Sequence, residues 1–186
     1  RRHGEDVEGE RDREAHRRAA LPHRAVVITL RPLAEGGREW ARSVVADGFG
    51  STMQMRPGRT WEDVTALEGL IAEVDGTPAG LLLYEDDGDA LEVCVILSVA
   101  EARGVGTALI DGARDVATSV GCRRLRVFTG NDNIDAIRFY QRRGFDMVAL
   151  HRDFMDEVRT QKPDVPVIGE SGIAMRHMLE LEQLLG

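Results

Sequence analysis

Apolar residues along this chain of 186 residues follow two different spacings, which predict strands in some segments and helices in others. Short β-branched and aliphatic runs bounded by turn residues predict strands at residues 25–30, 69–74, 79–84, 90–99, 124–129 and 146–150, and a last one near 175–181. Apolar residues three to four positions apart predict helices at residues 35–49, 106–120 and 133–145. The segment at 51–63 contains Pro57 and Gly58, and these turn residues predict a loop.

The order of these elements predicts an α/β fold. Three consecutive strands, at 69–74, 79–84 and 90–99, are joined by connections of only a few residues. Such short connections favour antiparallel neighbours, because a parallel pair needs a crossover of about a dozen residues or more. We therefore expect an antiparallel meander in the middle of the chain, followed by helices and further strands.

The first 24 residues differ from the rest of the chain in composition. Thirteen of them are charged, so this segment cannot bury an apolar face against a core. We expect residues 1–24 to form a disordered extension and residues 25–186 to form a single domain.

Composition and charge narrow the classes of function. The chain is 42% hydrophobic and 30% charged, as in ordinary globular proteins, and its formal net charge of −8 argues against nucleic-acid binding. Cys94 and Cys122 lack the spacing of a metal site or a disulfide framework, so we expect them to be buried in a reducing compartment. The acidic run at 85–89 fits a solvated hairpin tip better than a metal-binding loop. With no apolar run long enough to cross a bilayer and no apolar leader, we expect a cytoplasmic protein with no metal and no membrane partner.

Candidate chemistry begins at Gly104-Val105-Gly106, between a predicted strand and a predicted helix. The first backbone N–H groups of a helix lack partners inside it and carry partial positive charge, and glycine lets a bulky anion approach them. This segment could cradle phosphates with Arg103 as a charge partner, or it could simply form a tight turn. A dinucleotide fingerprint is excluded because Leu109 stands where a third glycine is required, and no Gly-Lys-Ser/Thr loop for a nucleoside triphosphate is present.

A second cluster lies on the predicted helix at 133–145. Asn133, Ala136 and Tyr140 follow one another at i, i+3 and i+7, so they share one face. An amide, a small alanine side chain and a phenol are an unusual combination for a helix face that only packs into the core. A phenol can pass a proton to a leaving thiolate, because both groups have pKa values in the same alkaline range. Alternatively, Tyr140 only packs and caps a neighbour.

Together the two clusters resemble the GNAT acetyltransferase superfamily, over residues 25–150. In that family a late helix reads Asn-x-x-Ala-x-x-x-Tyr, with Gly-Phe just beyond it. The residues that match this pattern are Asn133, Ala136, Tyr140, Gly144 and Phe145.

The coenzyme A loop of the family reads Gln/Arg-x-x-Gly-x-Gly/Ala and lies between the fourth strand and the following helix. Alignment on Gly104 and Gly106 places Glu101 at the Gln/Arg position, which departs from the pattern. The other register, Arg103-x-x-Gly106-x-Ala108, satisfies it. Both registers remain open, and they differ in which amides would contact which phosphate.

The resemblance implies a GNAT fold, with a mixed, mostly antiparallel central sheet of six or seven strands that is flanked by helices and splays between the fourth and fifth strands. It implies an N-acetyltransferase that uses acetyl-CoA as its cofactor and transfers the acetyl group directly to a primary amine, of a small molecule or a peptide, in a ternary complex. A non-catalytic acyl-CoA-binding or regulatory module is the alternative, and a homodimer is left open. The residues implied to bind the cofactor are Leu97, Ser98, Val99, Arg103, Gly104, Val105, Gly106, Thr107, Ala108, Asn133, Ala136, Phe139 and Tyr140.

Two residues are implied as catalysts. Tyr140 is expected to be the acid that protonates the leaving sulfur. Glu92 is the leading candidate for the base, because a carboxylate inside an apolar strand is costly to bury without a purpose or a partner. Alternatively, Glu92 only reaches solvent near a hairpin end, and His151 or His177 serves instead. Strand alternation predicts that four residues share one face: Glu92, Cys94, Ile96 and Ser98.

The acceptor pocket is the part of the site that the sequence defines least. The resemblance implies that residues 40–61 supply much of it. Met53, Met55 and Trp61 could line an adaptable apolar pocket, although core packing explains them equally well. The surplus of acidic residues suits a cationic acceptor, without choosing among polyamines, aminoglycosides and lysines.

Overall fold

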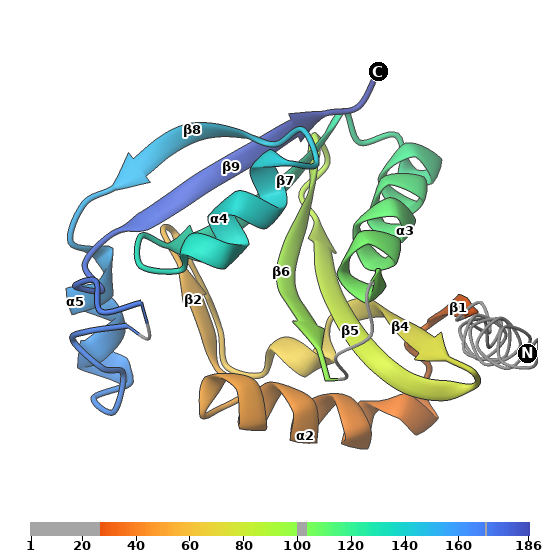
Figure 1. The fold of residues 1–186 in the computed structure, drawn as a ribbon, viewed down its shortest axis with the longest axis horizontal. Helices are drawn as coiled ribbons and strands as arrows, with labels where there is room; N and C mark the ends of the chain where they lie inside the picture. Colours follow the sequence, from red (N-terminus) through yellow and green to blue (C-terminus); the bar gives the residue numbers. More distant parts are fainter. Residues whose placement is uncertain (1–26, 100–103, 170) are drawn as a thin grey trace, which may run out of the picture.

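The computed structural model describes residues 27–99, 104–169 and 171–186. The predicted extension at 1–24 and Arg103 lie outside these residues, and the single domain at 25–186 stays a prediction. Within the described residues the main sheet has seven strands in the order β1-β4-β5-β6-β7-β9-β8 (Figure 1). Their bounds are β1 (Ile28–Pro32), β4 (Glu68–Val74), β5 (Thr77–Asp86), β6 (Ala90–Ser98), β7 (Arg124–Gly130), β8 (Asp146–His151) and β9 (Met178–Leu184).

Helices flank this sheet on both faces. The α-helices are α2 (Arg38–Phe49), α3 (Val105–Val120), α4 (Ile134–Gln141) and α5 (Phe154–Gln161), and the short 3-10 turns are η1 (Glu35–Gly37) and η2 (Val64–Ala66). The predicted α/β fold with a mostly antiparallel sheet is confirmed. Among the described residues, no helix is both long and apolar enough to span a membrane.

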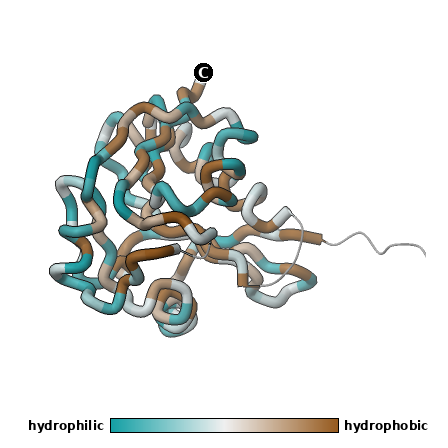
Figure 2. The backbone as a smooth tube through the Cα atoms, turned by 60° about the vertical axis from the view of Figure 1, so that its left-hand side comes forward, coloured by the Kyte–Doolittle hydropathy of each residue, from teal (hydrophilic) through white to brown (hydrophobic). Residues whose placement is uncertain are grey.

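Two apolar clusters hold the layers together, one on each face of the sheet. The face covered by α3 and α4 buries Leu109 of α3, Leu125 of β7 and Leu181 of β9 in one cluster. The face covered by α2 buries Val45 together with Ile71 of β4 in another. Full burial of each such side chain contributes about 1.5–3 kcal/mol to stability. Figure 2 shows the same distribution, with apolar segments concentrated in the interior and hydrophilic segments toward the outside.

The middle of the sheet opens between β6 and β7. Strands β4, β5 and β6 form the predicted antiparallel meander, whereas β6 and β7 run parallel because α3 connects them. Their pairing extends from Ala90 opposite Arg124 to Val93 opposite Val127 and then stops, although β6 continues to Ser98. The splay between the fourth and fifth strands, which the resemblance implied, therefore lies between β6 and β7.

One expectation about β6 is wrong. Val93 pairs with Tyr84 and Val95 pairs with Leu83, so Cys94 is an extra residue in β6 and forms a β-bulge. A bulge reverses the alternation of side chains beyond it. Glu92 and Cys94 therefore face the α2 side, whereas Ile96 packs with the cluster on the α3 side, so the four predicted residues do not share one face.

The segment predicted as a loop at 51–63 is also corrected. It forms a two-stranded antiparallel hairpin of β2 (Gln54–Arg56) and β3 (Arg59–Trp61), with Pro57 and Gly58 in the turn. Gly58 has φ +79°, the left-handed region that such a tight turn uses. The strands have three residues each, and this is too short for a period of two to be visible in the sequence.

Helix α5 was not predicted, and it supports the hairpin. Its buried residues Phe154, Met155 and Val158 form a small third cluster against which Met55 of β2 packs. Just beyond this helix, the Lys162 ammonium donates to the carbonyl oxygens of Phe49 (3.2 Å) and Met53 (3.3 Å). Burial lowers the pKa of Lys162. The segment between β8 and β9 thus holds the turn between α2 and β2 in place.

Candidate active site

The first turn of α3 presents backbone amides that lack partners within the helix, beside the end of β6. Gly104 caps the helix with φ +99°, a conformation that favours glycine, and Ala108 donates the first helical bond to the Gly104 carbonyl at 2.9 Å. The N–H groups of Val105, Gly106 and Thr107 therefore have no carbonyl one turn earlier inside the helix. Together with the helix dipole they form a positive region suited to an anion.

This turn lies next to the splayed strand because two glycines permit close packing. Gly80 pairs with Ser98, and a Cβ on Gly80 would clash with the Val105 side chain, so α3 begins beside the end of β6. A Cβ on Gly106 would lie 3.0 Å from the Phe139 ring, so α4 rests directly on the first turn of α3. The two predicted motifs, far apart in the sequence, thus meet in space.

Arg143 lies at the same turn, and sequence reasoning missed it. Its guanidinium is 3.6 Å from the centroid of the Phe139 ring, donates to the Phe139 carbonyl at 2.9 Å, and donates to the Thr107 hydroxyl. Burial lowers the pKa of Arg143, the charge of Asp111 opposes this effect, and the charges of Arg114 and Arg142 lower the pKa further. The pair of arginines before Gly144 is the signal that could have pointed to it.

Arg143 is also distinct in its partners. Among the arginines that are at least partly buried in the described part of the chain, it is the one without a carboxylate ion pair. A positive charge that has neither a carboxylate nor full hydration is costly unless an anion arrives. The others, each paired with a carboxylate, are Arg31, Arg38, Arg56, Arg114, Arg124, Arg126 and Arg159.

Tyr140 lies on the α3 side of the sheet, inside the apolar cluster. It is 5% exposed, and its ring contacts Phe139 and Phe145 with centroids 5.3 and 5.4 Å away. Burial raises the pKa of its hydroxyl, so the group stays protonated at neutral pH. No residue in the described segments hydrogen-bonds this hydroxyl. A protonated phenol without a protein partner is available as a proton donor.

Asn133 and Ala136, the other members of that motif, form the start of α4. Asn133 is the N-cap, and its side-chain oxygen accepts from the Ala136 amide at 3.1 Å. This bond satisfies one of the unpaired amides at the helix start. The side-chain N–H groups of the exposed Asn133 are not used by the cap.

The backbone of β6 directs part of its hydrogen-bonding groups into the opening. Val99 donates to the Ala79 carbonyl at 2.9 Å, so its amide is occupied by β5. Antiparallel pairs alternate between bonded and non-bonded positions, so Leu97 also faces β5, whereas Ile96 and Ser98 face the opening. Of the three residues predicted at 97–99, only Ser98 presents its backbone there, and Ile96 was missed.

Glu92 is buried on the α2 side and does not reach solvent, so that alternative is wrong. Its side chain is 2% exposed, and Oε1 accepts from Arg56 Nε at 2.6 Å. The other oxygen, Oε2, is buried without a hydrogen-bond donor from the described residues. Burial raises the pKa of Glu92, against the lowering effect of the hydrogen bond and charge of Arg56.

The two histidines considered as bases have other partners. His151 Nε2 lies 2.9 Å from a Glu180 oxygen, and His177 Nδ1 accepts from the Asp153 amide at 2.9 Å. His151 is the last residue of β8, with its ring centroid 5.8 Å from that of Phe128 of β7, and His177 directly precedes β9. Within the described residues, no group of three or more His, Cys, Asp or Glu side chains is placed to hold a metal ion.

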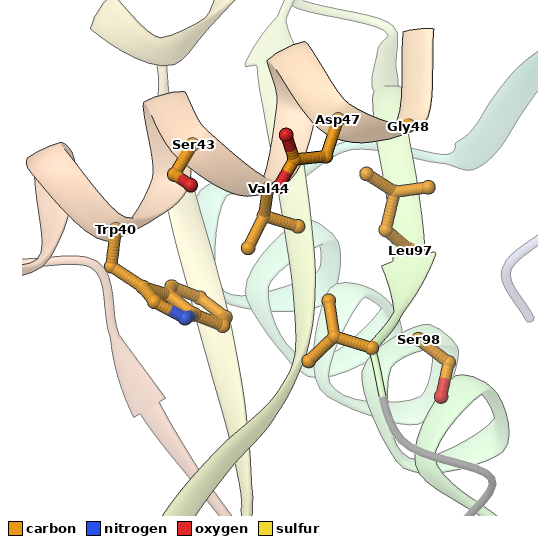
Figure 3. A pocket seen from close by; sticks show the side chains of 8 residues that line it. Trp40, Ser43, Val44, Asp47, Gly48, Leu97 and Ser98 are labelled. Carbon is orange, nitrogen blue, oxygen red and sulfur yellow. The ribbon is translucent and has the colours of Figure 1, made fainter.

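An open pocket of about 440 Å³ lies between α2 and the end of β6 (Figure 3). Figure 3 shows side chains of α2 on one wall and Leu97, which points toward α2, on the other. Trp61 and Met55 are not among its lining residues; Trp61 is buried in the α2-side core and Met55 packs toward α5. The lining residues are Trp40, Ser43, Val44, Asp47, Gly48, Leu97, Ser98 and Val99.

Comparison with known proteins identifies the family. The model of the acetyltransferase (GNAT) family matches residues 39–145, which include α2, the splayed strand and both motifs. The chain belongs to this family. A curated relative is the uncharacterized protein YdhI of Bacillus subtilis (strain 168), which is 35% identical over 111 residues, 59% of this chain and 69% of YdhI.

Solved structures agree on the GNAT fold. The IAA acetyltransferase from Bacillus cereus ATCC 14579 superimposes with a TM-score of 0.67 at 21% identity, covering 86% of this chain and all of that one. A GNAT family acetyltransferase from Elizabethkingia anophelis, solved with acetyl-CoA bound, has a TM-score of 0.63 at 18% identity over 85% and 98% of the two chains. At these identities the likeness shows the fold.

The residues of this chain fit a coenzyme A molecule. The amides of α3 and the carboxylate-free Arg143 suit phosphate groups, and Ile96 and Ser98 can bond an extended arm as an added strand would. These groups lie on one side of the sheet and suit a phosphorylated thioester substrate.

Proposed function

We propose that the chain is an acetyl-CoA-dependent N-acetyltransferase that transfers the acetyl group directly to a primary amine in a ternary complex. The observation that carries this proposal is the opening of the sheet beyond Val93 and Val127. Tyr140 lies on one side of the sheet, and Glu92 and the pocket lie on the other. Two substrates can therefore approach from opposite faces and meet within the opening.

The coenzyme would occupy the α3 side. We assign its phosphates to the amides of Val105, Gly106 and Thr107 and to Arg143, and its arm to backbone groups of Ile96 and Ser98. When bound, acetyl-CoA supplies the acetyl group as a thioester. Phe139 keeps α4 against the first turn of α3, so Tyr140 and the phosphate-binding turn form one rigid unit.

The acceptor would enter through the pocket beside α2. Glu92 takes a proton from the ammonium, so that the nitrogen lone pair can attack, and the Tyr140 hydroxyl donates a proton to the leaving sulfur. The carboxylate of Asp47 lines the pocket and makes no ion pair with the residues described, so it favours a cationic acceptor. Small amines and the amines of peptides both satisfy this requirement.

Two measurements test the proposal. Calorimetry with coenzyme A should detect binding, and thiol release from acetyl-CoA should appear when a panel of polyamines, aminoglycosides and lysine peptides is added. Absence of coenzyme binding would refute the proposal as a whole. Binding without thiol release from any amine would instead favour the non-catalytic module.

A further inference from the structure

A buried ion pair joins the β2–β3 hairpin to the splayed strand. Arg56 of β2 lies 2.6 Å from Glu92 of β6, and the Glu92 side chain is 2% exposed, less than the carboxylate of any other ion pair in the described residues. Taking a carboxylate out of water costs several kcal/mol unless a partner offsets it. Burial of this ion pair therefore costs free energy, and a functional role would explain why the pair is present.

Arg56 is itself held from several sides. Its guanidinium lies over the rings of Trp61 of β3 and Phe128 of β7, with centroid distances of 5.6 and 5.4 Å. Nη1 donates to the Pro57 carbonyl at 2.9 Å. A planar cation fixed between two aromatic faces has little freedom, so it presents Nε to Glu92 in one orientation.

Glu92 stands beside the point where the sheet opens. It pairs with Arg126 of β7, one residue before the last pair at Val93 and Val127. Its carboxylate faces the α2 side, the side on which the pocket lies. Arg56 occupies Oε1, and the buried Oε2 receives no donor from the described residues. One oxygen is anchored by Arg56, and the other is buried with its capacity to accept a proton unused by the described residues.

We propose that Arg56 is a positioning residue that fixes Glu92 with Oε2 directed to receive the proton of the acceptor amine. This inference rests on the proposed N-acetyltransferase function. An N–H bond of the ammonium breaks and its proton passes to Oε2, directly or through one water molecule. The freed lone pair forms the N–C bond to the acetyl carbonyl carbon as the C–S bond breaks, and the sulfur takes the proton of Tyr140.

Other ionisable groups surround Glu92 and set the background for its titration. Arg126 of β7 lowers its pKa, and Asp87, in the turn before β6, raises it. Glu85 of β5 is its cross-strand partner, and the Cys94 thiol, whose pKa is raised by burial, lies two residues along β6. Arg56 is the one cation that hydrogen-bonds Glu92 among the described residues, so its removal should dominate any change.

The hairpin offers a matched control. Arg59 lies over the same Trp61 ring at 5.6 Å and pairs with Glu85, but this pair is exposed, with 47% and 25% of the two side chains accessible. The two arginines differ in the carboxylate they bind and in its burial. Arg59→Gln therefore reproduces the loss of a hairpin arginine without touching Glu92.

The experiment measures kcat/KM for an acetylated amine as a function of pH in the wild type, Arg56→Gln, Arg56→Lys and Arg59→Gln. Loss of an opposite charge this close raises a carboxyl pKa by about 1–3 units, so the acid limb of Arg56→Gln should move to higher pH by about that amount. Arg56→Lys should shift it less, and Arg59→Gln should leave it in place. Coenzyme A affinity should be equal in all four proteins.

The result that overturns the inference is a uniform loss of activity in Arg56→Gln with an unmoved acid limb, because a purely structural role would produce it. Full activity in Glu92→Gln would also overturn it. If Arg56→Gln does not fold, Arg56→Met removes the same charge, and an unmoved acid limb in that protein decides against the inference. Wild-type protein that binds no coenzyme or acetylates no amine refutes the proposed function instead, and this inference falls with it.

Discussion

The two faces of the central sheet are built in different ways. On the α3 side, the groups assigned to the coenzyme come from three short stretches, the end of β6, the turn at 104–107 and the segment at 133–143, and apolar packing joins them. On the α2 side, the acceptor region depends on single contacts between distant segments. Arg56 and Glu92 are 36 residues apart, and Lys162 and Phe49 are 113 apart.

This difference indicates how the molecule separates its tasks. A coenzyme whose structure is constant can be bound by short local motifs. An acceptor that differs between enzymes can instead be bound by separate segments, each of which can change in sequence without affecting the others. Changes on the α3 side should therefore alter coenzyme affinity or the chemical step, and changes on the α2 side should alter the use of the amine.

The largest expected effect is that of Tyr140→Phe. Loss of a general acid lowers the rate by about 10²–10⁴-fold, so kcat should fall in that range while coenzyme A affinity stays constant. Only one buried hydroxyl is removed, so the melting temperature should change little. Tyr84→Phe, at the only other tyrosine of the chain, is the matched control and should keep its activity. If the Tyr140→Phe protein kept its activity, Tyr140 would not be the general acid.

The second largest effect is expected for Arg143→Ala. A hydrogen bond to a charged group contributes about 1.5–3 kcal/mol, so calorimetry should show coenzyme A binding weakened by about 10–100-fold. Binding of pantetheine, which lacks the phosphates, should be unchanged. Arg152→Ala, at an exposed arginine beyond β8 with no carboxylate partner in the described residues, should match the wild type. Equal weakening for pantetheine would contradict a phosphate contact.

Gly106→Ala tests the contact between α3 and α4. The new Cβ would lie 3.0–3.1 Å from the Phe139 ring, which must shift and carry the stacked Arg143 with it. Overpacking of this kind costs about 1–3 kcal/mol, so coenzyme binding should weaken about tenfold with a lower melting temperature. Gly36→Ala, where a Cβ meets nothing within 4 Å, should change neither quantity. An unaffected Gly106→Ala protein would show that the two motifs act separately.

Asp47→Asn should have the smallest effect and should appear only on the α2 side. An exposed charge pair contributes up to about 1 kcal/mol, so KM for a cationic amine should rise about fivefold. Coenzyme A affinity should stay constant. Asp115→Asn, at an exposed carboxylate of α3, is the control. A similar rise in KM for Asp115→Asn would mean that overall charge, and not the pocket, attracts the amine.

The same difference between the two faces explains which parts of the fold and the site could be predicted from the sequence. The α/β class, the antiparallel meander and the glycine turn follow from patterns within a few residues of one another, and the splay was implied by the family resemblance that the motifs carry. Arg143 could have been noticed, since two arginines precede Gly144, but its lack of a carboxylate partner is a fact of three-dimensional packing.

The features of the α2 side could not be predicted from local sequence patterns. The bulge at Cys94 is one extra residue in a continuous apolar strand, and nothing in its composition distinguishes it from regular pairing. The hairpin strands are three residues long, so their alternation was hidden. Glu92 was correctly singled out as an unusual carboxylate, but its partner Arg56 stood in a segment predicted to be a loop.

The ammonium of Lys162 fastens the corner where α2 ends to a part of the chain that lies beyond the family match at 39–145. The position of the turn that follows α2, next to the pocket, therefore depends on a side chain between β8 and β9. A substitution at Lys162 can therefore reshape the wall of this pocket from outside the matched segment, without altering the first turn of α3.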